Sequence, residues 1–294
     1  MNNLLLEIQN NKSKLQKLLK NKNNKIELEK WLKTELAYTS NAIEGNTLTR
    51  KETQLVIEEN LTSSSKPLKN YIEAVNHAKA FNKILELIEK DQPINEKEVL
   101  DIHRIILTGL DDINAGFYRN CRVRISGSNS ILPNPLKVPE LMADFYNWLG
   151  DSLEDEPLTA IMAHLKFVSI HPFTDGNGRT ARLLMNAILL KYGYVPIIVR
   201  PTDRKKYLSA IEACQTKGEE TTYIKLMLRL LSRSLKVIIN MFEVEDIHPS
   251  KLLTISKYAK LKGVPTSTIR YWVEIGKIKP TSYTDSGYML FKID

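Results

Sequence analysis

The sequence predicts an all-α fold that contains one short β-hairpin and ends in a small separate domain. Apolar residues recur at the three- and four-residue spacing of amphipathic helices over most of the 294 residues. One central stretch alternates basic and apolar residues up to a turn, which is a hairpin pattern. After residue 245 the segments become short and basic. We therefore predict an N-terminal helical region over 1–110, a core with the hairpin over 111–245 and a domain over 246–294.

The N-terminal region contains several predicted helices. Its first segment is rich in Asn and Lys and carries a leucine stripe that is marginal as an isolated helix. A second helix is expected from about Ile26 to Glu44, where Gly45 ends it. Thr49-Arg-Lys-Glu52 is a capping box that opens a third helix. Two amphipathic helices follow, over about 72–88 and from Val99 to Leu110.

The middle of the chain changes character after the first 115 residues. Arg122-Val-Arg-Ile-Ser126 alternates basic and apolar side chains, and Gly127-Ser-Asn-Ser130 follows as a turn, so we expect a short hairpin there. Helical periodicity then returns. Further helices are expected after Pro139, over Pro157–Ile170, from about Gly178 to Lys191, and over 202–216 and 221–242.

Composition restricts the class of protein. The net charge of +8 favours acidic or phosphorylated partners, and a solvated lysine surface would explain it equally well. The two cysteines, Cys121 and Cys214, form neither a metal-binding spacing nor a disulfide framework, which favours a reducing compartment. No apolar run approaches the ~18 residues of a membrane span, and the first residues do not resemble a signal peptide. We therefore expect a cytoplasmic protein with no membrane contact.

The segment HPFTDGNGRTAR, which begins at His171, carries the strongest chemical signal. Pro172 ends the preceding helix and leaves His171 at the edge of a loop, with Phe173 expected to anchor that loop in the core. Gly176 and Gly178 let the backbone turn tightly and present N–H groups to an anion. The next helix begins at these amides, so its dipole also favours a phosphate.

Polar side chains of the same segment complete a site for phosphate chemistry. Arg179 and Arg182 are three residues apart and share one face of the outgoing helix. Asp175 supplies the hard oxygen that Mg²⁺ prefers beside substrate phosphates, and Asn177 can orient the loop or a phosphate. His171 can take a proton near neutral pH. No Lys-Ser/Thr follows the glycines, so this is not a P-loop, and we predict phosphoryl or nucleotidyl transfer.

The segment resembles the signature of Fic-domain proteins, helical enzymes that typically transfer AMP from ATP to a hydroxyl of a target protein. All eight positions of His-x-Phe-x-Asp-Gly-Asn-Gly-Arg-x-x-Arg match, and the resemblance extends from about residue 30 to 235. It implies that His171 deprotonates a Ser, Thr or Tyr hydroxyl and that Asp175 holds Mg²⁺ on the phosphates of ATP. Doc-type kinases carry Lys at the place of Gly178, which argues against that branch. The nucleotide-binding residues that the resemblance implies are Gly176, Asn177, Gly178, Arg179 and Arg182.

Two further roles follow from the resemblance. The hairpin resembles the family's flap, which pairs with an extended target segment by strand addition; the alternative is a purely structural hairpin. Tyr207 would line an adenine pocket as in relatives, and core packing is the equal alternative. The flap residues expected to dock the target are Arg122, Val123, Arg124 and Ile125. The histidines expected to be structural are His77, His103 and His164.

The segment Ser40-Asn-Ala-Ile-Glu44-Gly45 resembles the Ser/Thr-x-x-x-Glu-Gly/Asn inhibitory motif of Fic proteins. Its place before the core implies the class with an N-terminal inhibitory helix, in which Glu44 pairs with Arg182 and removes the cation that seats the γ-phosphate. Glu44 is also expected at the negative end of a helix dipole, where a nearby cation would offset the unfavourable interaction between the carboxylate and the dipole. The alternative is an exposed carboxylate that costs a few tenths of a kcal/mol.

The last 44 residues have their own character. Residues 251–294 carry eight basic and three acidic residues, a net charge of +5. A helix from Thr254 to Gly263 and a second helix capped by Thr266 fit a basic helix-turn-helix. The run through Gly287 resembles the MerR/excisionase type with its wing. The DNA-contact residues expected near the start of the second helix are Thr268, Arg270 and Tyr271. Alternatively, this domain packs on the core, forms homodimers or presents targets.

The leading hypothesis is a self-inhibited protein adenylyltransferase that uses ATP and Mg²⁺ on a target protein or on itself. A second hypothesis is a DNA-binding regulator whose core senses nucleotide without turnover. A third is removal of AMP from a target, with Glu44 positioning water. The intact His171 favours an enzyme, because a pure sensor needs no general base.

Overall fold

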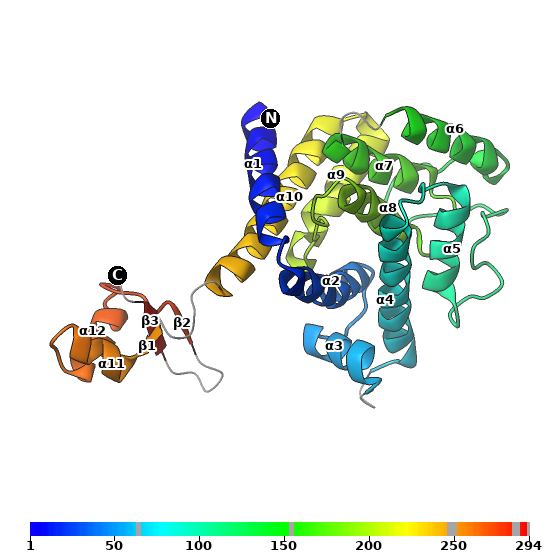
Figure 1. The fold of residues 1–294 in the computed structure, drawn as a ribbon. Coiled ribbons are helices and arrows are strands. Elements are labelled where there is room, and N and C mark those ends of the chain that lie inside the picture. Colours follow the sequence, from blue (N-terminus) through cyan, green and yellow to red (C-terminus); the bar gives the residue numbers. More distant parts are fainter. Residues whose placement is uncertain (63–65, 153–155, 246–251, 284–288, 293–294) are drawn as a thin grey trace. The chain divides into compact units, whose positions relative to one another are not determined.

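The computed structural model describes residues 1–62, 66–152, 156–245, 252–283 and 289–292. The chain forms two compact units, Met1–Ile238 and Ile239–Asp294 (Figure 1). Helices make up most of the described residues and the strands belong to the second unit, so the predicted all-α class is confirmed. The predicted limits of the three regions stay predictions. No helix in the described part of the chain combines the length and apolar character needed to cross a bilayer.

The helices predicted from periodicity are present, with ends that differ by a few residues. Their bounds are α1 Asn2–Leu18, α2 Lys22–Ile43, α3 Arg50–Glu59, α4 Leu68–Glu89, α5 Glu96–Leu107, α6 Val138–Asp151, α7 Glu156–Ile170, α8 Asn177–Lys191, α9 Arg204–Lys217 and α10 Glu220–Glu245. Short 3₁₀ turns, Pro135–Lys137 and Pro201–Asp203, precede α6 and α9. The capping box predicted at Thr49 and Glu52 opens α3 and is confirmed.

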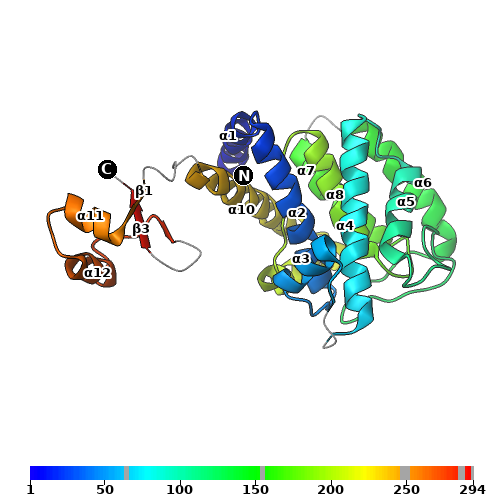
Figure 2. The same ribbon diagram turned by 60° about the horizontal axis from the view of Figure 1, so that its bottom comes forward.

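Helix α8 lies at the centre of the first unit. It packs most extensively on α7 and also contacts α2, α4 and α5. Helix α4 lies between α2 and α5 (Figure 2). Nearly every residue of α8 is buried, which includes the polar Asn177, Arg179 and Arg182. Because buried polar groups need partners, the neighbouring helices must supply them, and this requirement shapes the site.

One part of the predicted core is corrected by the structure. The segment predicted as a hairpin, 122–132, doubles back at a turn after Ile125, whose carbonyl accepts from Ser128 N at 3.2 Å. No strand is assigned to it, however, so its two arms do not form a β-ladder. The residues after the turn bond to helix α9 instead, with Asn129 N donating to Glu212 at 2.8 Å. The flap is therefore an extended loop held by a helix.

The second unit contains two short helices and a three-stranded antiparallel sheet. The elements after α10 are β1 Leu252–Thr254, α11 Ile255–Leu261, α12 Thr266–Glu274, β2 Ser282–Tyr283 and β3 Met289–Lys292, and the strand order is β1-β3-β2. Leu253 pairs with Phe291, and Phe291 stacks on Tyr258 with ring centroids 4.6 Å apart. Buried Ile269 of α12 joins this small core. Gly287 lies outside the described residues.

The cap predicted for α12 is wrong in one detail. Thr266 is the first residue inside the helix, and the cap position belongs to Pro265, which has φ −63° and makes no side-chain cap bond. Pro265 has an extended ψ of 154° and its carbonyl accepts from Thr268 N at 3.0 Å, so it is the last residue outside the helix. The expected helix-turn-helix arrangement of α11 and α12 is unaffected.

Candidate active site

The HPFTDGNGRTAR segment forms the loop between α7 and α8 and the first turns of α8. His171 has φ 53°, a left-handed conformation that non-glycine residues rarely adopt. Arg119 holds this turn, because its Nε donates to the His171 carbonyl at 2.8 Å and its backbone N–H donates to Pro172 O at 2.8 Å. Asn177 closes the loop with 2.9 Å bonds to both the N–H and the carbonyl of Phe173. The predicted loop-orienting role of Asn177 thus has a direct geometric basis.

The start of α8 is open to an anion. Its N-cap is Gly176, with φ 75° and no side chain to bond the first amides. A Cβ on Gly176 would lie 3.3 Å from the ring of His103, so the position requires glycine for both conformation and space. Free N–H groups at a helix start, together with the helix dipole, favour a phosphate at this point.

His103 of α5 supports this loop and was expected to have only a structural role. Its ring stacks on Phe173, with centroids 3.5 Å apart and an interplanar angle of 3°. Gly116 N donates to Nδ1 at 3.0 Å, so Nε2 carries the proton and donates to the carbonyl of Asp175 at 3.0 Å. Burial lowers the pKa of His103 to about 4, which keeps this neutral form. Sequence periodicity placed His103 on a helix but gave no sign of this contact.

The His171 ring is arranged to accept a proton. Its Nδ1 lies 3.4 Å from the carbonyl of Val168, which can only accept, so Nδ1 carries the hydrogen and Nε2 keeps its lone pair. Burial lowers the pKa of His171 to about 4, against the opposing effect of the Val168 carbonyl. The imidazole is therefore neutral at physiological pH, which is the form that a general base requires.

Two cavities meet at His171. One of ≈ 470 Å³ lies between the flap, the start of α8 and α9, and its lining includes Arg182, Arg204 and Lys205. The other, of ≈ 290 Å³, lies between Arg124 of the flap and the loop that leads into α8. Both are lined by His171, Gly178 and Glu44. A cavity of this size with several cations suits a nucleoside triphosphate.

Asp175 is the only acidic residue of the motif, and its carboxylate is open to solvent, with 59% of the side chain exposed. Burial opposes its ionisation, but Arg179 and the Gly176 N–H outweigh that effect and lower the pKa of Asp175. Within the described residues, no cluster of three acidic, His or Cys side chains could hold a metal. Asp175 therefore fits Mg²⁺ only in the way that Mg²⁺ usually binds, with one carboxylate and oxygens of substrate phosphates.

Arg179 is held by two carboxylates. Its Nη1 lies 3.2 Å from Glu73 of α4 and its Nη2 lies 3.3 Å from Asp175, and only 3% of the side chain is exposed. Glu73 also accepts a 2.9 Å bond from Asn46. No sequence pattern pointed to Glu73, which lies 106 residues before Arg179. The nucleotide-binding role predicted for Arg179 stays a prediction.

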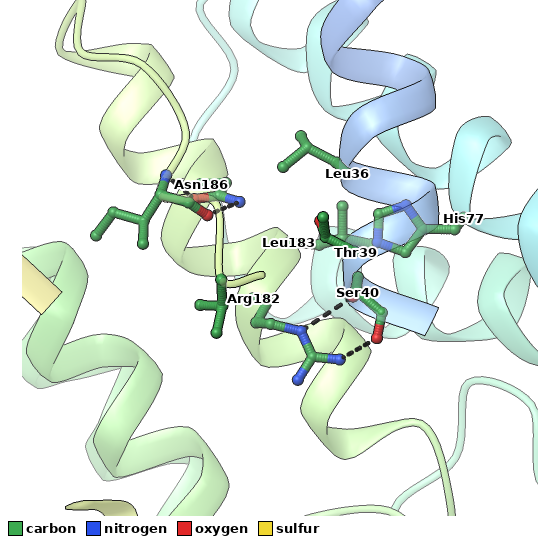
Figure 3. A pocket seen from close by; sticks show the side chains of 9 residues that line it. Leu36, Thr39, Ser40, His77, Arg182, Leu183 and Asn186 are labelled. Carbon is green, nitrogen blue, oxygen red and sulfur yellow. Dashed lines mark hydrogen bonds between the residues drawn. The ribbon is translucent and has the colours of Figure 1, made fainter. Parts of the chain in front are cut away.

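Arg182 is bound by the end of α2. Its Nε donates to Ser40 Oγ at 3.0 Å and its Nη2 to Ser40 O at 2.9 Å (Figure 3). The same Nη2 donates to Glu44 Oε1 at 2.7 Å. Burial opposes the charge of Arg182, yet the Glu44 carboxylate outweighs this effect and raises the pKa of Arg182. A Cβ on Gly178 would overlap Glu44 Oε1, so this contact needs glycine at that position.

The flap residues alternate in exposure. Arg122 and Arg124 are exposed, whereas Val123 and Ile125 are half-buried. In the described part of the chain, no backbone N–H between 122 and 126 donates to another backbone group. This edge is therefore free to accept a strand, and its docking role stays a prediction.

Tyr207 is only 1% exposed, and its hydroxyl lies 2.6 Å from His164 Nε2. It lines the larger cavity, so its adenine role stays a prediction. His77 is buried in α4 as expected, but neither ring nitrogen has a partner among the described residues. Burial, with Arg182 and Arg179 nearby, lowers the pKa of His77 to about 3.

The three DNA-contact residues lie on α12. Arg270 and Tyr271 are exposed, and Thr268 is half-buried. Ile269 and Trp272 face the small core of the second unit instead. The exposed pair is thus presented to solvent on one side of the helix, and its contact with DNA stays a prediction.

Comparison with known proteins matches two segments of the chain. Residues 93–189 match the Fic/DOC family, and residues 254–291 match the MerR family regulatory protein. The chain thus contains a segment that matches a Fic/DOC domain and one that matches a MerR domain, as predicted from the motifs. Helix α2, with Ser40 and Glu44, lies outside both matched segments.

Relatives and solved structures share the Fic name. A protein adenylyltransferase Fic of Nematostella vectensis is 36% identical over 67% of this chain and 47% of its own length. The protein of the same name from Aedes aegypti is 33% identical over 74% and 43%, respectively. The chain thus spans less than half of these relatives.

Among solved structures, a Fic domain containing signaling protein from Bacteroides thetaiotaomicron has a TM-score of 0.73 at 27% identity, covering 81% of this chain and 97% of its own. Fic-1 of C. elegans has a TM-score of 0.72 at 26% identity, covering 81% and 71%. The overall fold of this chain is therefore that of Fic proteins.

Proposed function

We propose that this protein is a protein adenylyltransferase, which transfers AMP from ATP to a Ser, Thr or Tyr hydroxyl of a target protein or of itself. The observation that carries the proposal is the neutral His171 with a free Nε2, beside the open start of α8 in a cavity lined by cations. The name of the relatives supports the same chemistry.

The proposed mechanism gives each group a step. His171 Nε2 takes the proton of the target hydroxyl, and the oxygen attacks the α-phosphorus of ATP. The bond between the α-phosphorus and the bridging oxygen breaks, and pyrophosphate leaves with its electron pair. The amides that follow Gly176 and the Arg182 guanidinium stabilise the negative charge. Asp175 would hold Mg²⁺ against the phosphates, where the ion neutralises part of their charge.

Glu44 is proposed to restrain this activity. Its carboxylate occupies the Arg182 guanidinium at 2.7 Å, and Ser40 fixes that guanidinium from the same helix. A γ-phosphate would have to compete with Glu44 for Arg182. Because the pair is charge-assisted, the competition should slow transfer until α2 moves or Glu44 is replaced.

The flap is proposed to position the target. Its unpaired backbone between Arg122 and Ile125 would bond to an extended segment, which would place a hydroxyl in front of His171. The flap tip cannot drift away freely, because Glu212 of α9 binds Asn129 N at 2.8 Å and Ser128 Oγ at 3.2 Å.

Intact-mass spectrometry tests the transferase and its restraint together. The Glu44→Gly protein is incubated with Mg²⁺ and each nucleoside triphosphate in turn, beside the wild type. We expect a mass gain of one AMP, with ATP only, that is faster than in the wild type. The gain should disappear when His171→Ala is added. A mass that stays unchanged in Glu44→Gly would refute self-modification, and a gain in the His171→Ala protein would refute the general base.

The same experiment addresses reverse chemistry. AMP-labelled protein, freed of nucleotide, is incubated with wild type and with Glu44→Gly. If Glu44 positions water for removal of AMP, only the wild type will erase the label. If Glu44 acts as a restraint alone, neither protein will erase it.

A second candidate function is DNA binding through the second unit. The observations that favour it are the match of 254–291 to the MerR family and the exposed Arg270 and Tyr271 on α12. Fluorescence anisotropy with duplex DNA at two salt concentrations tests it, because phosphate contacts weaken binding as salt rises. Arg270→Ala should weaken binding more than Lys260→Ala, which removes the same charge from the exposed side of α11. No binding, or binding that ignores salt, would refute this function.

A further inference from the structure

A buried chain of hydrogen bonds runs through three helices next to Arg182. It joins Tyr207 of α9, His164 of α7 and Tyr223 of α10, whose side chains are at most 1% exposed. Tyr207 Oη lies 2.6 Å from His164 Nε2, and Tyr223 Oη lies 2.7 Å from His164 Nδ1. The carbonyl of Ile161 accepts from Tyr223 Oη at 3.4 Å. At the other end, the Tyr207 hydroxyl interacts electrostatically with the Arg182 guanidinium, and both side chains line the larger cavity.

An Arg182 donor fixes the direction of the hydrogen bonds along this chain. The guanidinium has donors alone, so in any bond between the two residues the Tyr207 oxygen is the acceptor. The single Tyr207 hydrogen then goes to His164 Nε2, which leaves the imidazole proton on Nδ1. That proton goes to the Tyr223 oxygen, and the Tyr223 hydrogen goes to the Ile161 carbonyl. In this arrangement both hydroxyls and both ring nitrogens of the chain have a partner.

This chain approaches Arg182 from helices other than α2. Ser40 and Glu44 bind its Nε and Nη2 and both belong to the end of α2. Tyr207 comes from α9 and is fixed by His164, so it remains in place when the contacts of α2 with Arg182 are broken. Without Tyr207, the long Arg182 side chain would regain rotamer freedom, and binding a phosphate would then cost more conformational entropy.

We propose that His164 is a positioning residue for nucleotide binding, because it presents the Tyr207 oxygen as a fixed acceptor that orients Arg182 toward the phosphates of ATP. The inference rests on the proposed function, in which Arg182 binds a terminal phosphate. It gives Tyr207 a role through its hydroxyl, whereas a residue that only stacks on adenine would act through its ring.

Calorimetric titration of ATP and of AMP tests the inference. The background is Glu44→Gly with His171→Ala, which removes the competing carboxylate from Arg182 and prevents turnover. Adding Tyr207→Phe should weaken ATP binding by about 10-fold, the effect of losing one charged hydrogen bond, and change AMP binding by less than about twofold. Tyr194→Phe is the matched control, since it removes the hydroxyl of another buried tyrosine (5% exposed) and should leave both affinities unchanged.

Variants of His164 separate positioning from packing. His164→Leu should weaken ATP binding as Tyr207→Phe does, whereas His164→Gln retains an acceptor near the place of Nε2 and should restore part of the affinity. Equal weakening of ATP and AMP by Tyr207→Phe would overturn the inference in favour of adenine stacking. Unchanged ATP binding would overturn it as well.

The outcome also separates this inference from the proposed function. Should the background protein bind ATP no more tightly than AMP, the phosphate role of Arg182 would fail, and the inference would fail with it. Should the background protein bind ATP more tightly than AMP while Tyr207→Phe leaves both affinities unchanged, the proposed function would stand and the inference alone would be refuted.

Discussion

The restraint by Glu44 can be tested quantitatively with Glu44→Gln, which keeps the size and one acceptor oxygen but removes the charge. The bond to Arg182 is 2.7 Å long and joins a buried guanidinium to a carboxylate whose side chain is 39% exposed. Hydrogen bonds to charged groups contribute about 1.5–3 kcal/mol and neutral ones about 0.5–1.5 kcal/mol. Because water reaches Glu44, replacing its carboxylate with the amide of Gln should weaken the interaction with Arg182 by about 1 kcal/mol.

This energy sets an expected series of rates. A loss of about 1 kcal/mol corresponds to roughly fivefold faster AMP incorporation in Glu44→Gln. Glu44→Gly removes the whole pair, about 2 kcal/mol, and should be roughly 30-fold faster than the wild type. Initial rates at one subsaturating ATP concentration, followed by intact mass, measure the series. Glu27→Gln on the exposed side of the same helix is the control and should match the wild type.

The order of the three rates distinguishes an electrostatic restraint by Glu44 from a steric one. If Glu44 acted by bulk alone, Glu44→Gln would be as slow as the wild type while Glu44→Gly was fast. That result would refute the electrostatic account and leave a steric one. If Glu44→Gln were as fast as Glu44→Gly, the neutral hydrogen bond would contribute nothing and the magnitudes above would be wrong.

Other predictions follow from the supports of the site. Arg119→Ala removes donors to the carbonyls of His171 and Pro133 and should lower the free energy of unfolding by about 2–4 kcal/mol, measured by urea denaturation; an unchanged midpoint would contradict it. His103→Leu keeps an apolar side chain against Phe173 but loses the bonds to the Asp175 carbonyl and the Gly116 N–H, so AMP transfer should fall severalfold and Tm should drop; unaltered transfer would exclude this support. Burial lowers the pKa of His164 to about 3, so the unfolded chain binds a proton that the folded chain does not. The resulting contribution to the free energy of unfolding should therefore be fully present above pH 6.5, and the free energy of unfolding should fall by at least about 1 kcal/mol by pH 5. Equal denaturation midpoints at pH 7 and pH 5 would argue against a buried neutral ring.

The helices were predictable because their signals are local. Periodic apolar residues placed α7 and α8, and Pro172 marked the break between them. The flap was not predictable in the same way. Its alternation suggested paired strands, but the residues that hold its tip, Glu212 and Gln215, come from a helix more than 80 positions later. Pairing within a hairpin and bonding to a distant helix compete, and no local pattern shows which one prevails.

The sequence by itself determined the chemical inventory of the site: a histidine at position 171, an open helix start and two arginines on one helical face. It also indicated, through resemblance, that Glu44 pairs with Arg182. Only the tertiary structure decided how the two arginines differ, because Arg179 lies against Glu73 and Arg182 against the end of α2. The spacing of three residues places both guanidinium groups on one face, but their partners lie 106 and 138 positions away. The pairing of a buried charge depends on which carboxylate the packed helices bring within a few ångströms, and that distance exists only in the folded chain.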